Sequence, residues 1–111
     1  MERMNEADVK QSLKSVPEWS GNGGSTGSIQ RTYQFKDFVE SMKFVNAVAA
    51  AAEASQHHPD ILIRWNKVTL TLSTHDAGGI TPLDFALAAK SDALSIEQLD
   101  PRRAAGGKPK K

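Results

Sequence analysis

Three histidines, His57, His58 and His75, are the only ones in the chain and lie within residues 57–75. The unperturbed pKa of histidine is close to neutral pH, so an imidazole can both accept and donate protons without strong tuning. The pair follows the expected end of a helix, and His75 stands at the expected end of a strand. Reactive groups are commonly held at such positions of a rigid scaffold. The pattern therefore predicts acid–base chemistry at one edge of a sheet.

Two carboxylates accompany the histidines. Glu53 is expected in the last turn of the helix, where the helix dipole disfavours negative charge, so its presence indicates a partner such as an imidazole. Asp84 is the third residue after Thr81, a spacing that is typical of a capping box at a helix start. Capping and a role in the site are compatible. His57 also has a structural explanation, because the dipole favours a cation at the end of a helix.

A zinc site is the chemical alternative, because three imidazoles and a water molecule make a catalytic zinc geometry. Adjacent histidines such as His57 and His58 diverge in extended chain, however, and seldom bind one metal ion with ease. The chain has no HExxH motif, and it has no cysteine that could supply a thiolate. We therefore expect neither a metal nor another cofactor.

The first part of the chain predicts one helix and two strands. Asn5 is expected to cap a helix that ends before Pro17. Trp19 is expected to open a short strand, and the glycine-rich residues 20–28 to form a flexible hairpin turn. Alternating apolar and polar residues predict a half-buried strand over 29–35.

The second part predicts a helix, a hairpin and a last helix. Asp37 is expected to cap the first helix. Strands over 61–65 and 68–74 are joined by a tight turn at Asn66-Lys67. Trp65 alternates with Ile61 and Ile63, so we expect it in the core. Thr81-Pro82 is expected to start the last helix. The apolar stripe of the helix after Asp37 is expected to be Phe38, Met42, Val45, Ala49 and Ala52.

Pairs of adjacent strands around a helix predict an α+β fold, a four-stranded antiparallel sheet with three helices packed on one face. The order is helix-strand-strand-helix-strand-strand-helix. A length of 111 residues fits one domain, which we place at residues 1–100. Residues 101–111 are basic, rich in Gly and Pro and poor in apolar residues, so we expect a disordered tail.

The net charge of +1 hides an uneven distribution. Five of the 14 Lys and Arg lie in the tail, whereas residues 1–101 carry nine basic against all 13 acidic residues, a balance of −4. A body of that sign does not favour nucleic acid as a partner. No apolar run suits a signal peptide or a membrane span. We therefore expect a cytoplasmic protein without a membrane partner.

The spacing of the candidate site residues resembles the pattern of the pterin-4a-carbinolamine dehydratase family. The matching positions are Glu53, the triplet His57-His58-Pro59, Trp65, His75 and Asp84. The resemblance covers roughly residues 35–89 and includes the run Ser73-Thr74-His75-Asp76-Ala77-Gly78-Gly79-Ile80-Thr81. It implies the α+β architecture reached above. It also implies dehydration of a 4a-hydroxytetrahydropterin to quinonoid dihydropterin and water, in the recycling of a tetrahydrobiopterin-type cofactor.

The resemblance implies a role for each matching residue. His57, His58 and His75 are the implied catalytic set, in which His57 and His75 transfer protons and His58 holds the pterin. Gln56 departs from the family, which often has an acidic residue there. Further implications are a homodimer or homotetramer and a functional link to an aromatic amino acid hydroxylase. The implied substrate-binding residues are Glu53, Pro59, Trp65, Ser73, Thr74 and Asp84.

Two other functions remain open. Some members of the family act as dimerisation cofactors for a transcription factor, through a helical surface and without catalysis. A helix face that stays apolar after the fold is closed would support this role. An enzyme that handles a molybdenum-cofactor pterin would use the same pocket as the dehydratase.

Overall fold

The computed structural model describes residues 2–97, so the expected tail over 101–111 lies outside the described residues. The helices and strands come in the order predicted from the sequence, with two short 3₁₀ helices added. The elements are α1 (Glu6–Leu13), β1 (Ser20–Asn22), η1 (Gly24–Thr26), β2 (Ser28–Gln34), α2 (Phe38–Ser55), β3 (Asp60–Arg64), β4 (Lys67–Leu72), η2 (His75–Ala77) and α3 (Pro82–Glu97).

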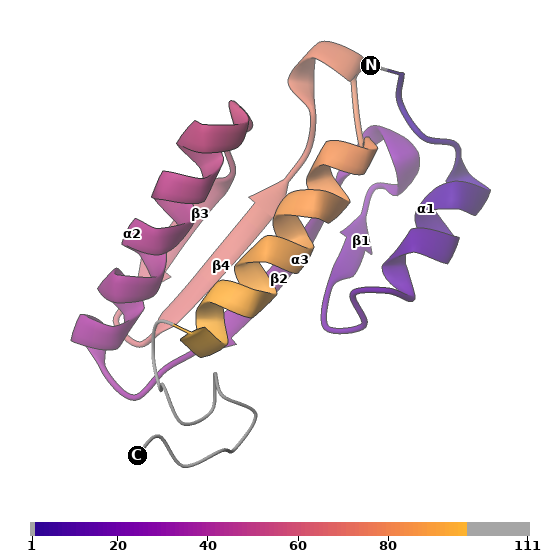
Figure 1. Ribbon diagram of the computed structural model, residues 1–111. Helices are drawn as coiled ribbons and strands as arrows, with labels where there is room; N and C mark the ends of the chain where they lie inside the picture. The colour runs from indigo at the N-terminus through magenta and orange to yellow at the C-terminus, as the bar shows by residue number, and fades with distance from the viewer. Residues whose placement is uncertain (1, 98–111) are drawn as a thin grey trace.

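The four strands form one antiparallel sheet in the order β1-β2-β4-β3. Figure 1 shows the three α-helices on the same side of this sheet, which leaves its other face uncovered within residues 2–97. The predicted α+β class, with its sheet and its single helical layer, is therefore confirmed. No helix of the described residues is both long and apolar enough to cross a membrane.

The helix starts were predicted correctly because their caps are local. The side chain of Asn5 accepts a hydrogen bond of 2.8 Å from the Asp8 N–H at the start of α1. Asp37 accepts one of 2.9 Å from the Glu40 N–H at the start of α2. α3 begins at Pro82, where the fixed φ of proline suits the first helical position.

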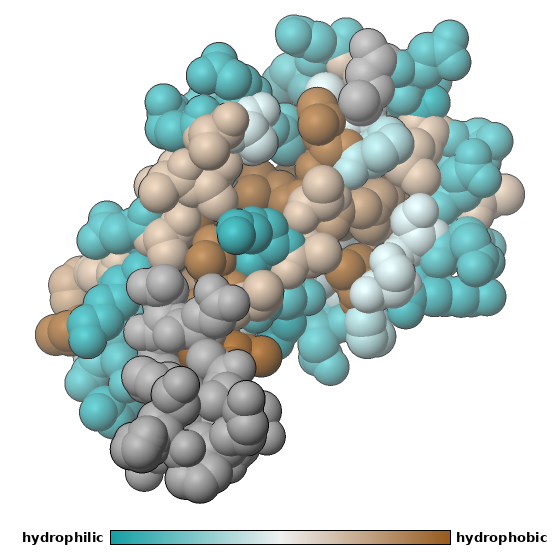
Figure 2. All heavy atoms as spheres, in the orientation of Figure 1, coloured by the Kyte–Doolittle hydropathy of each residue, from teal (hydrophilic) through white to brown (hydrophobic). Residues whose placement is uncertain are grey.

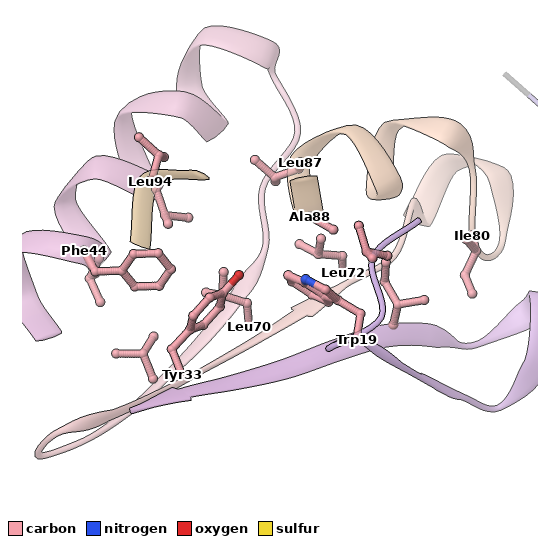
Figure 3. Close-up of a cluster of buried hydrophobic side chains, with 14 of the residues drawn as sticks. Trp19, Tyr33, Phe44, Leu70, Leu72, Ile80, Leu87, Ala88 and Leu94 are labelled. Carbon is pink, nitrogen blue, oxygen red and sulfur yellow. The ribbon is translucent and has the colours of Figure 1, made fainter. Parts of the chain in front are cut away.

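The core lies between the sheet and helices α2 and α3 (Figure 3). Phe44 from α2 packs against Tyr33 of β2, with ring centroids 4.5 Å apart. Leu70 and Leu72 of β4 are fully buried beneath the helices. Burying one large apolar side chain contributes about 1.5–3 kcal/mol, so this layer is the main source of stability.

The predicted stripe of α2 was wrong in part. Phe38 is 48% exposed and Ala49 is also exposed, whereas Phe44 and Val48 are completely buried. Val45 and Ala52 belong to both the predicted and the observed face. The buried face of the helix therefore overlaps the predicted face only in part.

The predicted turn between β3 and β4 was also displaced by one residue. Arg64 pairs with Lys67, so the turn consists of Trp65 and Asn66. Asn66 donates its side-chain N–H to the Phe35 carbonyl at 3.1 Å and accepts the Phe35 N–H at 2.8 Å. These two bonds hold the turn, and Trp65 takes a left-handed φ of 54°. Its side chain is 66% exposed, so its expected place in the core is wrong.

Residues 20–28 carry more structure than the expected flexible turn. They contain β1 and η1, and Trp19 is buried just before the strand. The Ser25 N–H donates to the Glu6 carboxylate at 2.9 Å, a bond that lowers the pKa of Glu6. The Ser25 carbonyl in turn accepts the Ile80 N–H at 2.9 Å. The segment therefore connects α1 to the loop that precedes α3.

Candidate active site

The three histidines lie at one end of the molecule. His57 and His58 connect α2 to β3, and His75 opens η2 after β4. In Figure 1 the end of α2, the loop after β4 and the start of α3 all lie at the upper end of the view. All three histidines, together with Ser73 and Thr74, line a depression of about 270 Å³, which we call the histidine hollow.

The end of α2 separates the two adjacent histidines. Gln56 has a left-handed φ of 58°, and its N–H donates to the Glu53 carbonyl at 3.3 Å. The His57 N–H reaches back to the Ala52 carbonyl at 3.0 Å, which completes a Schellman turn. After this turn His57 is only 8% exposed, whereas the side chain of His58 is 61% exposed.

Asp84 connects the site to the start of α3. His57 Nε2 is 2.6 Å from Asp84 Oδ1, and the Asp84 side chain is fully buried. The other oxygen, Oδ2, accepts the Thr81 N–H and the Thr74 hydroxyl, each at 2.9 Å. Asp84 therefore forms the expected capping box and holds His57 at the same time. An ionised carboxylate can only accept, so we assign the proton to Nε2, which leaves Nδ1 of His57 available to a ligand.

Glu53 pairs with His58 rather than with His57. His58 Nε2 is 2.5 Å from Glu53 Oε2, so the carboxylate in the last turn of α2 has the imidazole partner that its position indicated. The two side chains are 61% and 73% exposed. A contact between two exposed polar side chains contributes little to stability, so it orients His58 more than it holds the fold.

His75 lies in a closed loop rather than at a strand end. β4 stops at Leu72, two residues earlier than predicted. The Thr74 N–H then donates to the Gly79 carbonyl at 2.8 Å, and the Gly79 N–H returns a bond of 3.2 Å. Gly78 turns the chain with a φ of 75°, a conformation that suits glycine. The loop presents His75 as an exposed side chain.

The remaining predicted residues divide into two groups. Ser73 and Thr74 belong to the histidine hollow, and the Ser73 hydroxyl donates to the Gly27 carbonyl at 2.8 Å. Pro59 follows His58 in the chain but does not line the hollow. Trp65 lies beyond the far end of β3, a strand of five residues that is about 16 Å long. The structure therefore does not bring Trp65 to the histidines within one chain.

Three residues of the hollow were not predicted, namely Gln56, Asp76 and Leu83. Each is the direct neighbour of a predicted residue, and that adjacency is the one signal in the sequence that could have indicated them. Within residues 2–97 no three histidine or carboxylate side chains are arranged to hold a metal ion.

Two further depressions adjoin the histidine hollow. One, which we call the helix groove, lies between α2 and α3, measures about 320 Å³ and is lined by His57, Leu83, Lys90 and mostly apolar neighbours. Figure 2 shows apolar surface in the middle of this helical face, interrupted by hydrophilic atoms at its centre and bordered by polar side chains. The other, which we call the outer hollow, measures about 220 Å³ and is lined by Gly27, Ser28, Asp60, Thr71 and three residues of the histidine hollow.

Known proteins resemble this chain over most of its length. A protein of Thermomicrobium roseum, named "Putative pterin-4-alpha-carbinolamine dehydratase", is 50% identical over 95 residues, which are 86% of this chain and 99% of the relative. A protein of Picosynechococcus with the same name is 47% identical over 92 residues, which are 83% of this chain and 97% of the relative.

A solved structure resembles the fold. The crystal structure of a transcriptional coactivator/pterin dehydratase from Brucella melitensis matches with a TM-score of 0.79 and 33% identity, over 84% of this chain and 98% of that one. The model of the family described as pterin 4 alpha carbinolamine dehydratase matches residues 2–94. The chain therefore belongs to the pterin 4 alpha carbinolamine dehydratase family.

Proposed function

We propose that this protein dehydrates a 4a-hydroxytetrahydropterin to quinonoid dihydropterin and water by histidine acid–base catalysis. In this step the C4a–O bond breaks and the hydroxyl leaves as water with a proton from an acid. A base removes the proton of N5, and the electron pair of that N–H bond forms the C4a=N5 double bond. The reaction needs an acid and a base but no electron acceptor.

The observation that carries the proposal is the His57–Asp84 pair at the wall of a hollow that also contains His58 and His75. The buried carboxylate stabilises the imidazolium whenever His57 carries both protons, as a carboxylate does in other catalytic pairs. His75, exposed on the facing loop, supplies a second imidazole for the other proton transfer. One such group contributes on the order of 10²–10⁴-fold to a rate.

The remaining polar groups suit the binding of a flat heterocycle. We propose that His58, oriented by Glu53, holds the pterin ring, together with Ser73 and Thr74. The Thr74 hydroxyl is already bonded to Asp84, so its main contribution is to position that carboxylate.

A direct assay tests the proposal. The 4a-hydroxytetrahydropterin is generated in situ by an aromatic amino acid hydroxylase, and its decay is followed by stopped-flow absorbance with and without the purified protein. We expect decay well above the spontaneous rate, in proportion to the protein added. A decay rate that is independent of the protein would refute the proposal.

A second candidate is a non-enzymatic binding module, since the similar protein from Brucella melitensis is named a transcriptional coactivator as well as a pterin dehydratase. The observation that favours it is the helix groove, whose lining is mostly apolar and includes Ala51, Ala54 and Leu87. In that case charged substitutions such as Ala54→Glu should abolish partner binding and leave the dehydration rate unchanged. A molybdenum-cofactor pterin is a third candidate substrate, and it would occupy the same histidine hollow.

We also propose that the protein is a homodimer or homotetramer. β1 and β3 are the edges of the sheet, and unpaired edges are usually covered or paired with another chain. β3 carries Leu62, whose side chain is 56% exposed. β2 is not an edge, because it lies between β1 and β4.

A further inference from the structure

The outer hollow lies beside the histidine hollow, toward the uncovered face of the sheet. His58, Ser73 and His75 line both depressions. Thr71 stands opposite Asp60 in the β3–β4 register, between the buried residues Leu70 and Leu72. Alternate residues of a strand point to opposite faces, so Asp60 and Thr71 project away from the helices. The outer hollow is therefore an extension of the site over the open side of the sheet.

The outer hollow has the chemistry of a site for hydroxyl groups. Ser28 and Thr71 offer hydroxyls that can donate and accept, and Asp60 offers a carboxylate that accepts. On the same sheet face Thr32 and Thr69 satisfy each other at 2.7 Å. In contrast, no hydrogen bond within residues 2–97 engages the side chains of Ser28, Asp60 or Thr71. These groups are free to bind a ligand.

The charge of the outer hollow sets a limit on that ligand. Neither lysine nor arginine is among its lining residues, and Asp60, which lines it, is exposed. A phosphate placed there would face the Asp60 carboxylate without a lysine or arginine to balance it, and of the two imidazoles in the lining His58 is already paired with Glu53. The hollow therefore suits a neutral polyhydroxylated group.

The covalent structure of a pterin determines which of its groups can reach the outer hollow. The reacting atoms C4a and N5 are bonded to each other, and C6 is bonded to N5. A substituent on C6 therefore leaves the ring beside the histidines that handle the reaction. It can run past His58 and His75 into the outer hollow, or past His57 into the helix groove. The helix groove is mostly apolar, so hydroxyl groups placed there would lose their bonds to water without replacement.

The volumes of the two hollows are consistent with one ligand that occupies both. Ligand pockets usually begin at roughly 300 Å³. The histidine hollow and the outer hollow, at about 270 Å³ and about 220 Å³, are each smaller than that. A pterin ring in the first with its substituent in the second would use both.

We propose that the outer hollow binds the hydroxylated C6 substituent of the pterin through Ser28, Asp60 and Thr71, and disfavours a substituent that carries a phosphate. This inference rests on the proposed dehydration. It makes these three residues determinants of substrate specificity rather than catalytic residues.

The test compares two substrates that differ only at C6, a 4a-hydroxytetrahydropterin with a dihydroxypropyl group and one with a methyl group. We expect the wild-type protein to show a kcat/KM for the diol that is roughly threefold to tenfold higher, the effect of one or two net hydrogen bonds. Thr71→Val removes one hydroxyl at nearly constant volume and should lower this ratio roughly threefold, through KM. Thr69→Val on the same strand face is the matched control and should keep the ratio.

The predicted exclusion of phosphate is tested by fluorescence titration with a stable product analogue. The analogue is a 7,8-dihydropterin whose dihydroxypropyl group is phosphorylated. We expect it to bind wild type on the order of threefold more weakly than the unphosphorylated form. Asp60→Lys should reverse that order, and circular dichroism confirms the fold of each variant. Tighter binding of the phosphorylated form to wild type would overturn the predicted exclusion of phosphate.

The outcomes separate this inference from the proposed function. Turnover of the methyl substrate with no preference for the diol would overturn the inference and leave dehydration established. A ratio that responds to Lys90→Gln but not to Thr71→Val would place the substituent in the helix groove and also overturn it. Absence of turnover for both substrates would refute the dehydratase itself. A tighter affinity for the diol, lost in Thr71→Val, would then still support the outer hollow as a binding site.

Discussion

His57 Nε2 lies 2.6 Å from Asp84 Oδ1, and the same buried carboxylate accepts the Thr81 N–H that starts α3. One side chain therefore serves both the helix start and the proposed proton transfer. If Asp84 served only to cap α3, it would need no imidazole partner. If it served only to orient His57, it would not need to lie three residues after Thr81, which is the capping-box spacing. The arrangement places His57 relative to a helix end rather than to a flexible loop.

We predict that Asp84→Asn lowers kcat roughly tenfold or more, because an amide cannot stabilise an imidazolium as a carboxylate does. Stability should fall by about 1–3 kcal/mol, since a buried site loses a charged acceptor. The control is Thr81→Ala, which removes the hydroxyl that accepts the Leu83 N–H at 3.2 Å and should cost about 1 kcal/mol with a much smaller effect on kcat. Equal losses of turnover in the two variants would reduce Asp84 to a cap.

Substitutions of the three histidines should have different effects on kcat and KM in steady-state kinetics. His57→Gln keeps an N–H for Asp84 but cannot exchange protons, so kcat should fall, and His75→Ala should lower kcat as well. The double variant should lose more than either single one. His58→Ala should mainly raise KM, because we assign it to binding. Unchanged activity in the double variant would leave the binding module as the leading function.

His57→Ala is a poorer test than His57→Gln. From the sequence, none of the histidines belongs to an apolar stripe, so folding is expected to survive their removal. The structure places His57 at 8% exposure with a buried carboxylate as its partner. Truncation to alanine would leave Asp84 short of a partner and should cost about 1–3 kcal/mol.

Assembly should be visible in sedimentation velocity. At micromolar concentration we expect species heavier than the 12.0 kDa of one chain, because β1 and β3 leave two sheet edges unpaired in the described residues. Leu62→Lys places a charge on the exposed side of β3, a means by which natural edge strands avoid pairing. A shift of this variant toward the monomer would assign the contact to β3. A wild-type monomer would contradict the prediction.

Removal of residues 101–111 should change little. The segment lies outside the described residues, its apolar side chains are only alanine and proline, and the family match ends at residue 94. It can therefore contribute little apolar burial. The truncated chain should keep the melting temperature and the dehydration rate of the full chain. A fall of several degrees would show that the tail docks on the domain.

The predictable parts of the fold are those that local chemistry decides. Asn5, Asp37 and Thr81 were recognised as helix starts because a cap involves residues only two or three positions apart. The face of α2 was predicted less well. The helix is rich in alanine, so small side chains occur all around it, and the packing of Phe44 and Val48 against the sheet decides its rotation.

The displaced hairpin turn has a similar cause. Local preference favours Asn66 as the first turn residue, but its two bonds to Phe35 fix it as the second. Ile61 and Ile63 pack against the core as their alternation predicts, but Trp65 is the first turn residue rather than the last strand residue. With its left-handed φ of 54° it leaves the alternation, and this is why it was wrongly placed in the core. The histidine hollow could be predicted from residue types and spacing. The outer hollow could not, because Ser28, Asp60 and Thr71 look like ordinary polar residues of a solvent-facing sheet.

Tyr33 offers a pH test of the core, because its hydroxyl meets a cluster of polar groups there. Asp92 Oδ1 accepts the Tyr33 hydroxyl at 2.5 Å, the Trp19 indole N–H at 3.0 Å and Arg31 Nη1 at 2.8 Å. The Arg31 guanidinium also lies over the Tyr33 ring, 4.2 Å from its centroid. Burial first, and the hydrogen bond to Asp92 second, raise the pKa of Tyr33 well above its ordinary value.

A raised pKa in the folded protein means that ionisation of Tyr33 favours the unfolded chain. The stabilisation is complete below the unfolded pKa of about 10 and is lost as the pH rises above it, by about 1.4 kcal/mol per pH unit. Tyr33 is the only tyrosine, so ultraviolet absorbance of tyrosinate reports it directly. Urea unfolding at about pH 8 and about pH 11 should show the loss in wild type. The free energy of unfolding of Tyr33→Phe should fall less between these two pH values. Titration of Tyr33 near pH 10 in the folded protein would contradict the raised pKa.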